Sequence, residues 1–186
     1  MSDARCPETD FPAQSRIESL LSLEKYMTVS TVSSGGMPRT TPVFFAHGRS
    51  MQGLLTFYWL STAEATHSQN LLAFNRVSGV IFDSSVPQGT GVGFFFEATA
   101  RMADYKKVFD GRCTEAEYAA RLLCEKGPNL PRDPSKLLRP DCPRRIFMLS
   151  VDKAWFNGAE KSGDIWVDAT RPFDKRNFDP GLRWQS

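Results

Sequence analysis

Two short stretches of the sequence carry side chains that suit an anionic ligand. Arg39 offers a guanidinium group that can form two parallel hydrogen bonds with a phosphate. The second stretch offers hydroxyl groups and an imidazole around the expected start of a helix: Ser61, Thr62, Thr66, His67 and Ser68. The first backbone amides of that helix would add a weakly positive end. Taken singly, Arg39 could be a solvated strand charge, Thr66 a helix cap and His67 an exposed polar residue.

Other kinds of reactive site are not indicated. No Ser-His-Asp order and no carboxylate pair stands out, so the sequence names no catalytic residue. Cys6, Cys113, Cys124 and Cys142 form no C-x-x-C pair, and the two histidines lie far from them in the chain. We therefore expect free thiols and no metal site.

Composition points to one globular domain. The 186 residues suffice for one core, which we place at about residues 15–169, with a charged tail over 170–186. The net charge of +2 favours neither nucleic acid nor an anionic membrane as a partner. No apolar run could span a bilayer, and the segment Met1 to Gln14 does not read as a secretory signal, so we expect a cytoplasmic protein.

The pattern of apolar residues predicts about six strands and a few short helices. The expected helices are Ser15 to Leu23, Thr66 to Phe74 and Thr114 to Lys126. The expected strands are Tyr26 to Val32, Met37 to Ala46, Leu54 to Leu60, Val77 to Phe82, Val92 to Met102 and Arg144 to Phe156, with a short one at Ile165 to Val167. Without a βαβ rhythm, this favours an α+β, mainly β, barrel.

The expected strand Val92 to Met102 suggests a partner subunit. Its centre, Phe94 to Phe96, is apolar on both faces, whereas a strand that is wet on one face should alternate. A second copy of the chain is a natural cover for the outer face, so we expect a homodimer. The prolines Pro38 and Pro42 predict that the strand from Met37 is irregular or partly at an edge.

Several motifs resemble, in order and spacing, the pyridoxamine 5'-phosphate oxidase-like family of flavin-binding split barrels. They are Pro38-Arg39-Thr40-Thr41-Pro42-Val43-Phe44-Phe45, Leu60-Ser61-Thr62, Thr66-His67-Ser68-Gln69-Asn70-Leu71-Leu72, Phe74-Asn75-Arg76-Val77 and Phe96-Glu97-Ala98-Thr99-Ala100-Arg101. The resemblance implies a six-stranded antiparallel split β-barrel with short flanking helices. It also implies FMN as the cofactor, bound between the subunits of a homodimer.

The resemblance also implies roles for particular residues. It places Arg39, Ser61, Thr62, Thr66, His67 and Ser68 around the flavin phosphate and ribityl chain. It places the backbone of Thr40, Thr41, Pro42 and Val43 against the ring edge, and Gly93 where many relatives carry a polar ring contact. Where the family's oxidases usually have two cations, this chain has His67 and Ser68, so at most one cation remains. The arginine and histidine that hold the vitamin substrate are also missing, so vitamin B6 synthesis is not expected.

The resemblance leaves three functions open. The first is an FMN-dependent oxidoreductase acting on a small or planar organic substrate, in which the cofactor performs the redox chemistry. The second is a deazaflavin-dependent reductase, which the missing cation would suit. The third is a non-catalytic carrier or sensor of flavin or haem, for which His47, His67, a methionine or a cysteine would be the axial ligand.

Overall fold

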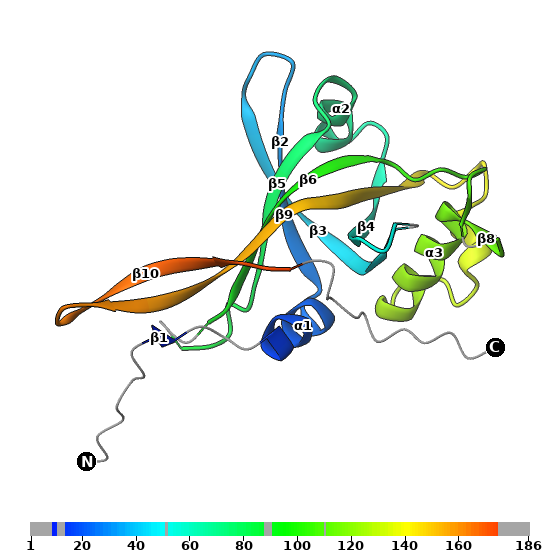
Figure 1. Cartoon of the computed structure of the whole chain (residues 1–186). Coiled ribbons are helices and arrows are strands. Elements are labelled where there is room, and N and C mark those ends of the chain that lie inside the picture. Colours follow the sequence, from blue (N-terminus) through cyan, green and yellow to red (C-terminus); the bar gives the residue numbers. More distant parts are fainter. Residues whose placement is uncertain (1–8, 11–13, 51, 88–90, 110, 175–186) are drawn as a thin grey trace.

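The computed structural model describes residues 9–10, 14–50, 52–87, 91–109 and 111–174 (Figure 1). The elements in chain order are β1 (Thr9–Asp10), α1 (Gln14–Leu23), β2 (Tyr26–Val32), β3 (Pro38–Arg49), β4 (Leu55–Thr62), α2 (Thr66–Ala73), β5 (Arg76–Phe82), β6 (Gly93–Met102), β7 (Val108–Phe109), β8 (Cys113–Thr114), α3 (Glu115–Lys126), the 3-10 helix η1 (Pro134–Leu137), β9 (Arg144–Ser162) and β10 (Ile165–Pro172).

Six of the strands form a closed antiparallel barrel. They run in the order β9-β4-β3-β2-β5-β6, and the pairing of β6 with β9 closes the ring. The long strand β9 then leaves the barrel and forms a projecting arm with β10 (Figure 1). The fold class expected from the sequence is confirmed: mainly β, a six-stranded antiparallel barrel with short flanking helices.

The core has two parts. Inside the barrel, aromatic side chains from β3, β4 and β6 are fully buried, among them Phe45, Phe57, Trp59, Phe94 and Phe96. Outside it, α3 packs on β3, β4 and β9 around a second cluster that includes Tyr58 and Tyr118. Gly48 of β3 allows this close packing, since a Cβ there would lie 2.7 Å from the Tyr118 hydroxyl oxygen.

Several strands are longer than predicted because of their neighbours. β9 continues past Phe156 to Ser162 and β10 continues past Val167 to Pro172, since these two strands pair with each other. β3 continues through His47 to Arg49, where a turn had been expected, since Phe45–Arg49 pairs with β4. β4 continues through Ser61 to Thr62, since β9 pairs with it to its end. Pairing partners that are remote in the sequence therefore set these ends.

The two-faced apolar strand β6 is partly covered by its own chain. Phe94 and Phe96 point into the barrel, while Phe95 points outward and stacks on Trp155 of β9, with ring centroids 6.4 Å apart. The outward residues that follow, Glu97 and Thr99, are polar. The outer face of β6 is thus apolar at Phe95 alone, and this strand by itself does not require a subunit interface.

Within the described ranges, no helix is both long and apolar enough to cross a membrane. Cys124 and Cys142 are free thiols there, and Cys6 lies outside the described residues.

Candidate anion-binding site

The barrel is split between β3 and β4, next to the first predicted site residue. β3 pairs with β4 only through its second part, Phe45–Arg49. Its first part, Pro38–Phe44, pairs with β2 alone among the described strands. The other edge of this part, which includes the backbone of Thr40 to Val43, is open to a ligand. Pro42 suits such an edge because it has no amide hydrogen to pair, which confirms the prediction of a strand partly at an edge.

Helix α2 follows directly on β4 at this split. The Ala65 amide donates to the Thr62 carbonyl oxygen over 3.4 Å, and Gln69 Nε2 donates to the Ala63 carbonyl oxygen over 2.7 Å. The helix therefore begins beside the end of β4. Its N-cap is Ala65, which makes no side-chain cap. The prediction that Thr66 caps the helix was wrong: Thr66 is the first helical residue, and its side chain is exposed.

His67 and Ser68, in the first turn of α2, are buried. His67 is 8% exposed and Ser68 is 3% exposed, so the alternative that His67 is an exposed polar residue is wrong. The reason is helical geometry, because His67, Asn70 and Leu71 share the face that packs on the barrel. His67 Nε2 and Ser68 Oγ have no hydrogen-bond partner among the described residues. Buried polar atoms normally have one, so both atoms could still form a hydrogen bond with a further polar group.

Arg39 meets this turn from the other side of the split. Burial lowers the pKa of His67 below its usual 6.5, and the nearby positive charge of Arg39 lowers that pKa further. The Arg39 charge is thus near enough to His67 to affect its titration. Within the described residues, the exposed Arg39 guanidinium has no ion pair or hydrogen bond. The cation is therefore available to a ligand, and an anion there would offset its repulsion of a protonated His67.

The remaining residues predicted on β3 are divided between its two faces. Thr41 and Val43 lie on the same face as Arg39, and Val43 is buried in the barrel core, so only its backbone could contact a ligand. Thr40 and Pro42 lie on the outer face, where Thr40 Oγ1 and Ser30 Oγ are 2.8 Å apart. On β4, Ser61 is buried and Thr62 is exposed.

Gly93 lies apart from these residues within one chain. It pairs with Phe82 at one end of β5, whereas α2 adjoins the other end, which begins at Arg76. β2 and β5 also separate its strand from β3, a lateral distance of about 14 Å at ordinary strand spacing. The Gly93 amide donates to Asn157 Oδ1. In one chain, Gly93 and the Arg39 region cannot contact the same part of a ligand.

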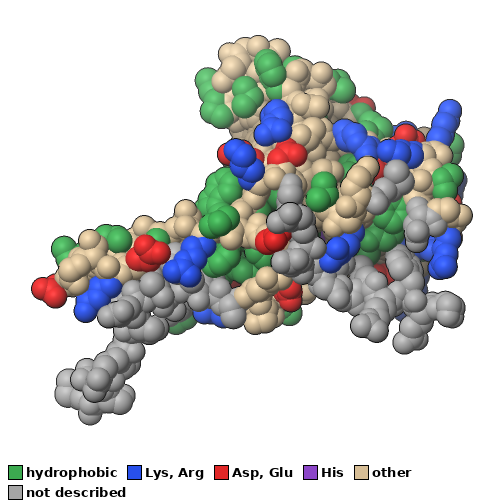
Figure 2. Space-filling model, in the orientation of Figure 1, with side chains coloured by type: hydrophobic (Ala, Val, Ile, Leu, Met, Phe, Trp, Pro, Cys, Tyr) green, Lys and Arg blue, Asp and Glu red, His purple; other side chains and the backbone are tan. Residues whose placement is uncertain are grey.

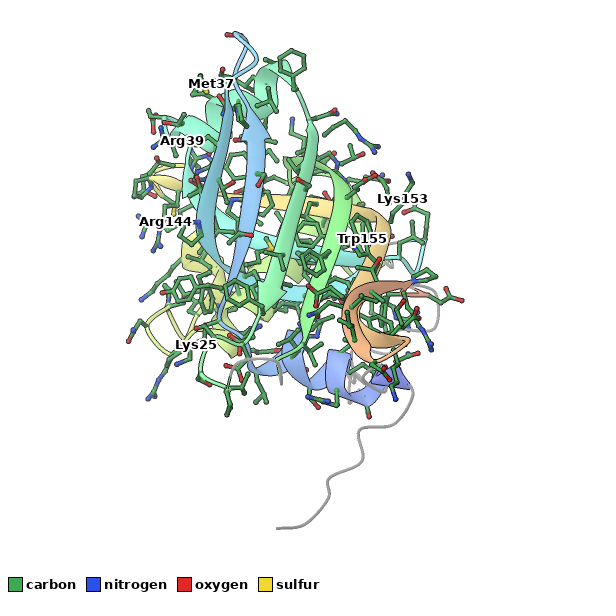
Figure 3. All side chains as sticks on the ribbon, turned by 90° about the vertical axis from the view of Figure 1, so that its left-hand side faces the viewer. Lys25, Met37, Arg39, Arg144, Lys153 and Trp155 are labelled. Carbon is green, nitrogen blue, oxygen red and sulfur yellow. The ribbon has the colours of Figure 1, made fainter. Side chains whose placement is uncertain are left out.

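Sequence reasoning missed a second cation beside the site. Arg144, the first residue of β9, pairs in register with Thr62. It is exposed, and its guanidinium has no ion pair among the described residues. Arg39 and Arg144 lie on the same side of the molecule (Figure 3). No local signal could have found Arg144, because only the pairing of β4 with β9 brings it to Thr62.

The two histidines offer little to a metal. In the described part of the chain, no three His, Cys, Asp or Glu side chains gather as metal ligands would. His47 is largely buried between the barrel and the helices, and its pKa falls to about 4, chiefly through burial and then through the charge of Lys126. Neither His47 nor His67 presents an exposed imidazole.

Comparisons with known proteins agree on the fold. No protein-family model and no curated protein sequence matches this chain. Among solved structures, HutZ, the haem storage protein of Vibrio cholerae, is 17% identical with a TM-score of 0.55, and the match covers 76% of this chain and 92% of HutZ. A FAD-binding protein of Mesorhizobium loti is 13% identical with a TM-score of 0.55, over 80% of this chain and 96% of that one.

A candidate pyridoxamine 5'-phosphate oxidase of Listeria innocua is 13% identical with a TM-score of 0.52, over 75% of this chain and 94% of that one. These matches span nearly the whole of each structure, and the closed six-stranded barrel agrees with them. The chain has the pyridoxamine 5'-phosphate oxidase-like split-barrel fold.

Proposed function

We propose that this chain is a homodimeric FMN-binding oxidoreductase acting on a small or planar organic substrate. The observation that carries the proposal is the meeting of Arg39 with the first turn of α2, where His67 Nε2 and Ser68 Oγ are buried without partners. A dianionic phosphate would give the Arg39 guanidinium a counter-charge and would give the His67 imidazole and Ser68 Oγ a hydrogen-bond acceptor. The FAD-binding protein with this fold supports a flavin as the ligand.

Each part of the site has a task in this proposal. The Arg39 guanidinium pairs with the phosphate, and Ser68 Oγ and the imidazole of His67 donate hydrogen bonds to it. The uncapped amides of the first turn of α2 add their positive end. The open edge of β3 offers backbone groups to the rim of the flavin ring. When bound, the flavin supplies the hydride and electron chemistry, and the protein supplies position and access.

The dimer in this proposal rests on an apolar surface of the barrel. Cross-strand pairing brings outward side chains of β2, β3, β5, β6 and β9 onto one face, which we call the outer sheet face: Tyr26, Pro42, Val80, Phe82, Phe95 and Trp155. Figure 3 looks onto this face, with Trp155 beside β6. Tyr26 is 60% exposed and Phe82 is 49% exposed. The pairs Lys153–Glu97 and Arg76–Asp152 border it with charge, as is usual around an apolar interface centre.

A second apolar patch adjoins the anion-binding site. Met37 at the tip of the β2–β3 hairpin, Leu72 of α2 and Phe74 just after α2 are exposed. Figure 2 shows hydrophobic side chains at the top of the molecule, where the hairpin and α2 lie. A second copy that covered these surfaces would enclose a ligand at the split. It could also bring its own Gly93 toward a ring that the first copy's Gly93 cannot reach.

Two other cofactors are separate outcomes of the same test. A deazaflavin is favoured by the single histidine where the family's oxidases have two cations. HutZ, which has this fold, is a haem storage protein. In this chain His67 is buried and His47 is partly buried with a pKa lowered to about 4, so neither offers an exposed axial ligand, which favours a flavin over haem.

The absorption spectrum of protein purified without denaturant tests the proposal. Flavin bands, with FMN identified as the released cofactor, are expected. A colourless preparation would then be titrated with FMN, riboflavin and a deazaflavin. A Soret band, or failure to bind FMN more tightly than riboflavin, would contradict the proposed function.

A further inference from the structure

A chain of buried hydrogen bonds crosses the split and ends at Arg39. Asn70 of α2 donates from Nδ2 to Thr31 Oγ1 of β2 over 2.9 Å. The Thr31 hydroxyl donates in turn to the backbone carbonyl oxygen of Arg39 over 3.4 Å. Thr31 is fully buried and Asn70 is 7% exposed. Buried polar groups are costly unless they are satisfied, so the bond between Asn70 and Thr31 favours one arrangement of α2 on β2, and the longer contact connects it to Arg39.

The two ends of this series of hydrogen bonds belong to different halves of the anion-binding site. Arg39 comes from the β2–β3 hairpin, whereas His67 and Ser68 come from a helix that continues β4. Along this stretch β3 and β4 do not pair, so backbone hydrogen bonds between these two strands do not fix the spacing of the halves. Asn70 lies one helical turn after His67, on the same face of α2.

We propose that Asn70 and Thr31 are positioning residues, which hold the Arg39 backbone at a set distance from the first turn of α2. The inference rests on the proposed function, because the flavin phosphate is the ligand group whose binding would depend on this distance. A phosphate needs both halves at once, whereas a ligand that touches only the open edge of β3 does not. The hydrogen bonds from Asn70 to Thr31 and from Thr31 to Arg39, which we call the relay, should therefore affect the affinity for FMN and leave the affinity for riboflavin unchanged.

The first test is Thr31→Val, which keeps the shape of the side chain and removes both hydrogen bonds. FMN affinity should fall by about threefold to tenfold, the range for one lost hydrogen bond, while riboflavin affinity stays within about twofold. The matched control is Thr28→Val on the same strand. The Thr28 hydroxyl bonds the backbone of Val80, away from α2, so this variant should not change the FMN-to-riboflavin ratio.

A double variant separates positioning from stability. Thr31→Val alone leaves the Asn70 amide buried without a partner, which destabilises the fold, whereas replacing both partners with apolar groups is often nearly neutral. Thr31→Val/Asn70→Leu should therefore recover thermal stability toward wild type, with FMN affinity still reduced. Recovery of FMN affinity together with stability would show a merely structural role and overturn the proposal.

Combination with Arg39→Ala completes the test. If the relay acts through Arg39, Thr31→Val should have no further effect on FMN affinity in the Arg39→Ala background. Additive losses would overturn the inference. If Arg39→Ala weakens FMN binding but Thr31→Val does not, only the positioning role fails. If wild type does not distinguish FMN from riboflavin, the proposed function itself fails.

Discussion

At the scale of single residues, the candidate site places the cations Arg39 and Arg144 near a histidine whose pKa is lowered. Burial and the charge of Arg39 both hold the pKa of His67 down. The sequence had indicated a protonated His67 in place of a missing cation. In the proposed complex Arg39 is the first partner of the phosphate, and protonation of His67 depends on the bound anion.

Arg39→Ala should weaken FMN binding by about tenfold to a hundredfold, because a charge-assisted contact contributes roughly 1.5–3 kcal/mol. Fluorescence titration of the cofactor-free protein measures this. Arg171→Ala is the control, since Arg171 is also a strand arginine but lies on the β9–β10 arm. Equal affinities of Arg39→Ala and wild type for FMN would place the ligand elsewhere.

His67 should make FMN binding depend on pH. A bound phosphate dianion raises the pKa of His67 from its lowered value, because it favours the charged imidazole. The affinity gained from protonation is full below the pKa of the free protein and is lost as pH rises through the pKa of the complex. Without ligand, His67 affects the stability of the fold in the opposite direction. Because its pKa is lower in the folded protein than in the unfolded chain, the free energy of unfolding is highest above about pH 6.5, the unfolded pKa, and decreases as pH falls below that value.

Titrations of wild type and His67→Gln with FMN, between about pH 5.5 and 8, isolate this contribution, because the phosphate of FMN itself titrates near pH 6 in both. Riboflavin controls for effects on the ring. Since His67 is buried, the variant's thermal unfolding must be measured alongside. Parallel pH profiles for the two proteins would show that His67 does not contact the phosphate.

At the scale of elements, the close approach of β5 to β2 supports the hairpin that carries Arg39. A Cβ on Gly79 of β5 would lie 2.1 Å from the Thr28 carbonyl oxygen and 2.4 Å from Cζ of Phe96. Backbone cannot yield this much without disturbing the sheet. Glycine at this position therefore lets β2 and β5 pair over a barrel filled by Phe96.

Gly79→Ala should lower the free energy of unfolding by about 1–3 kcal/mol, the usual effect of overpacking. Gly35→Ala, in the β2–β3 turn, is the control, because the nearest atom to its Cβ is Ser33 Oγ at 3.9 Å. Urea denaturation measures both. A Gly79→Ala protein as stable as Gly35→Ala would mean that β2 and β5 lie further apart.

At the scale of the whole molecule, a second copy of the chain would cover the outer sheet face and enclose a ligand at the split. Phe82→Glu places a charge on the outer sheet face and should convert the proposed dimer to a monomer without unfolding the barrel. Val108→Glu, at an exposed apolar residue of β7, should leave the mass unchanged. Light scattering reports the mass and circular dichroism the fold. A wild-type monomer at micromolar concentration would contradict the dimer.

The sequence alone determined the features that depend on neighbouring residues. Val29, Thr31 and Val32 favour an extended backbone, and β2 begins and ends where the sequence predicted. The capping box of Thr114 and Glu117 is present at the start of α3, since both hydrogen bonds form within one turn. The apolar pattern indicated a mainly β barrel, and the resemblance of the ordered motifs to a known family implied six antiparallel strands, which the structure confirms.

Only the tertiary structure decided how these elements meet. The helical pattern did not show that His67 faces the barrel, because its burial depends on how α2 docks against β2. The pairing of Thr62 with Arg144 and the bond between Asn70 and Thr31 join residues far apart in the chain. The split itself arises because β3 pairs with β4 only from Phe45 onward. Pro38 and Pro42 indicated an edge in this strand, but the sequence did not show which neighbouring strand would be missing there.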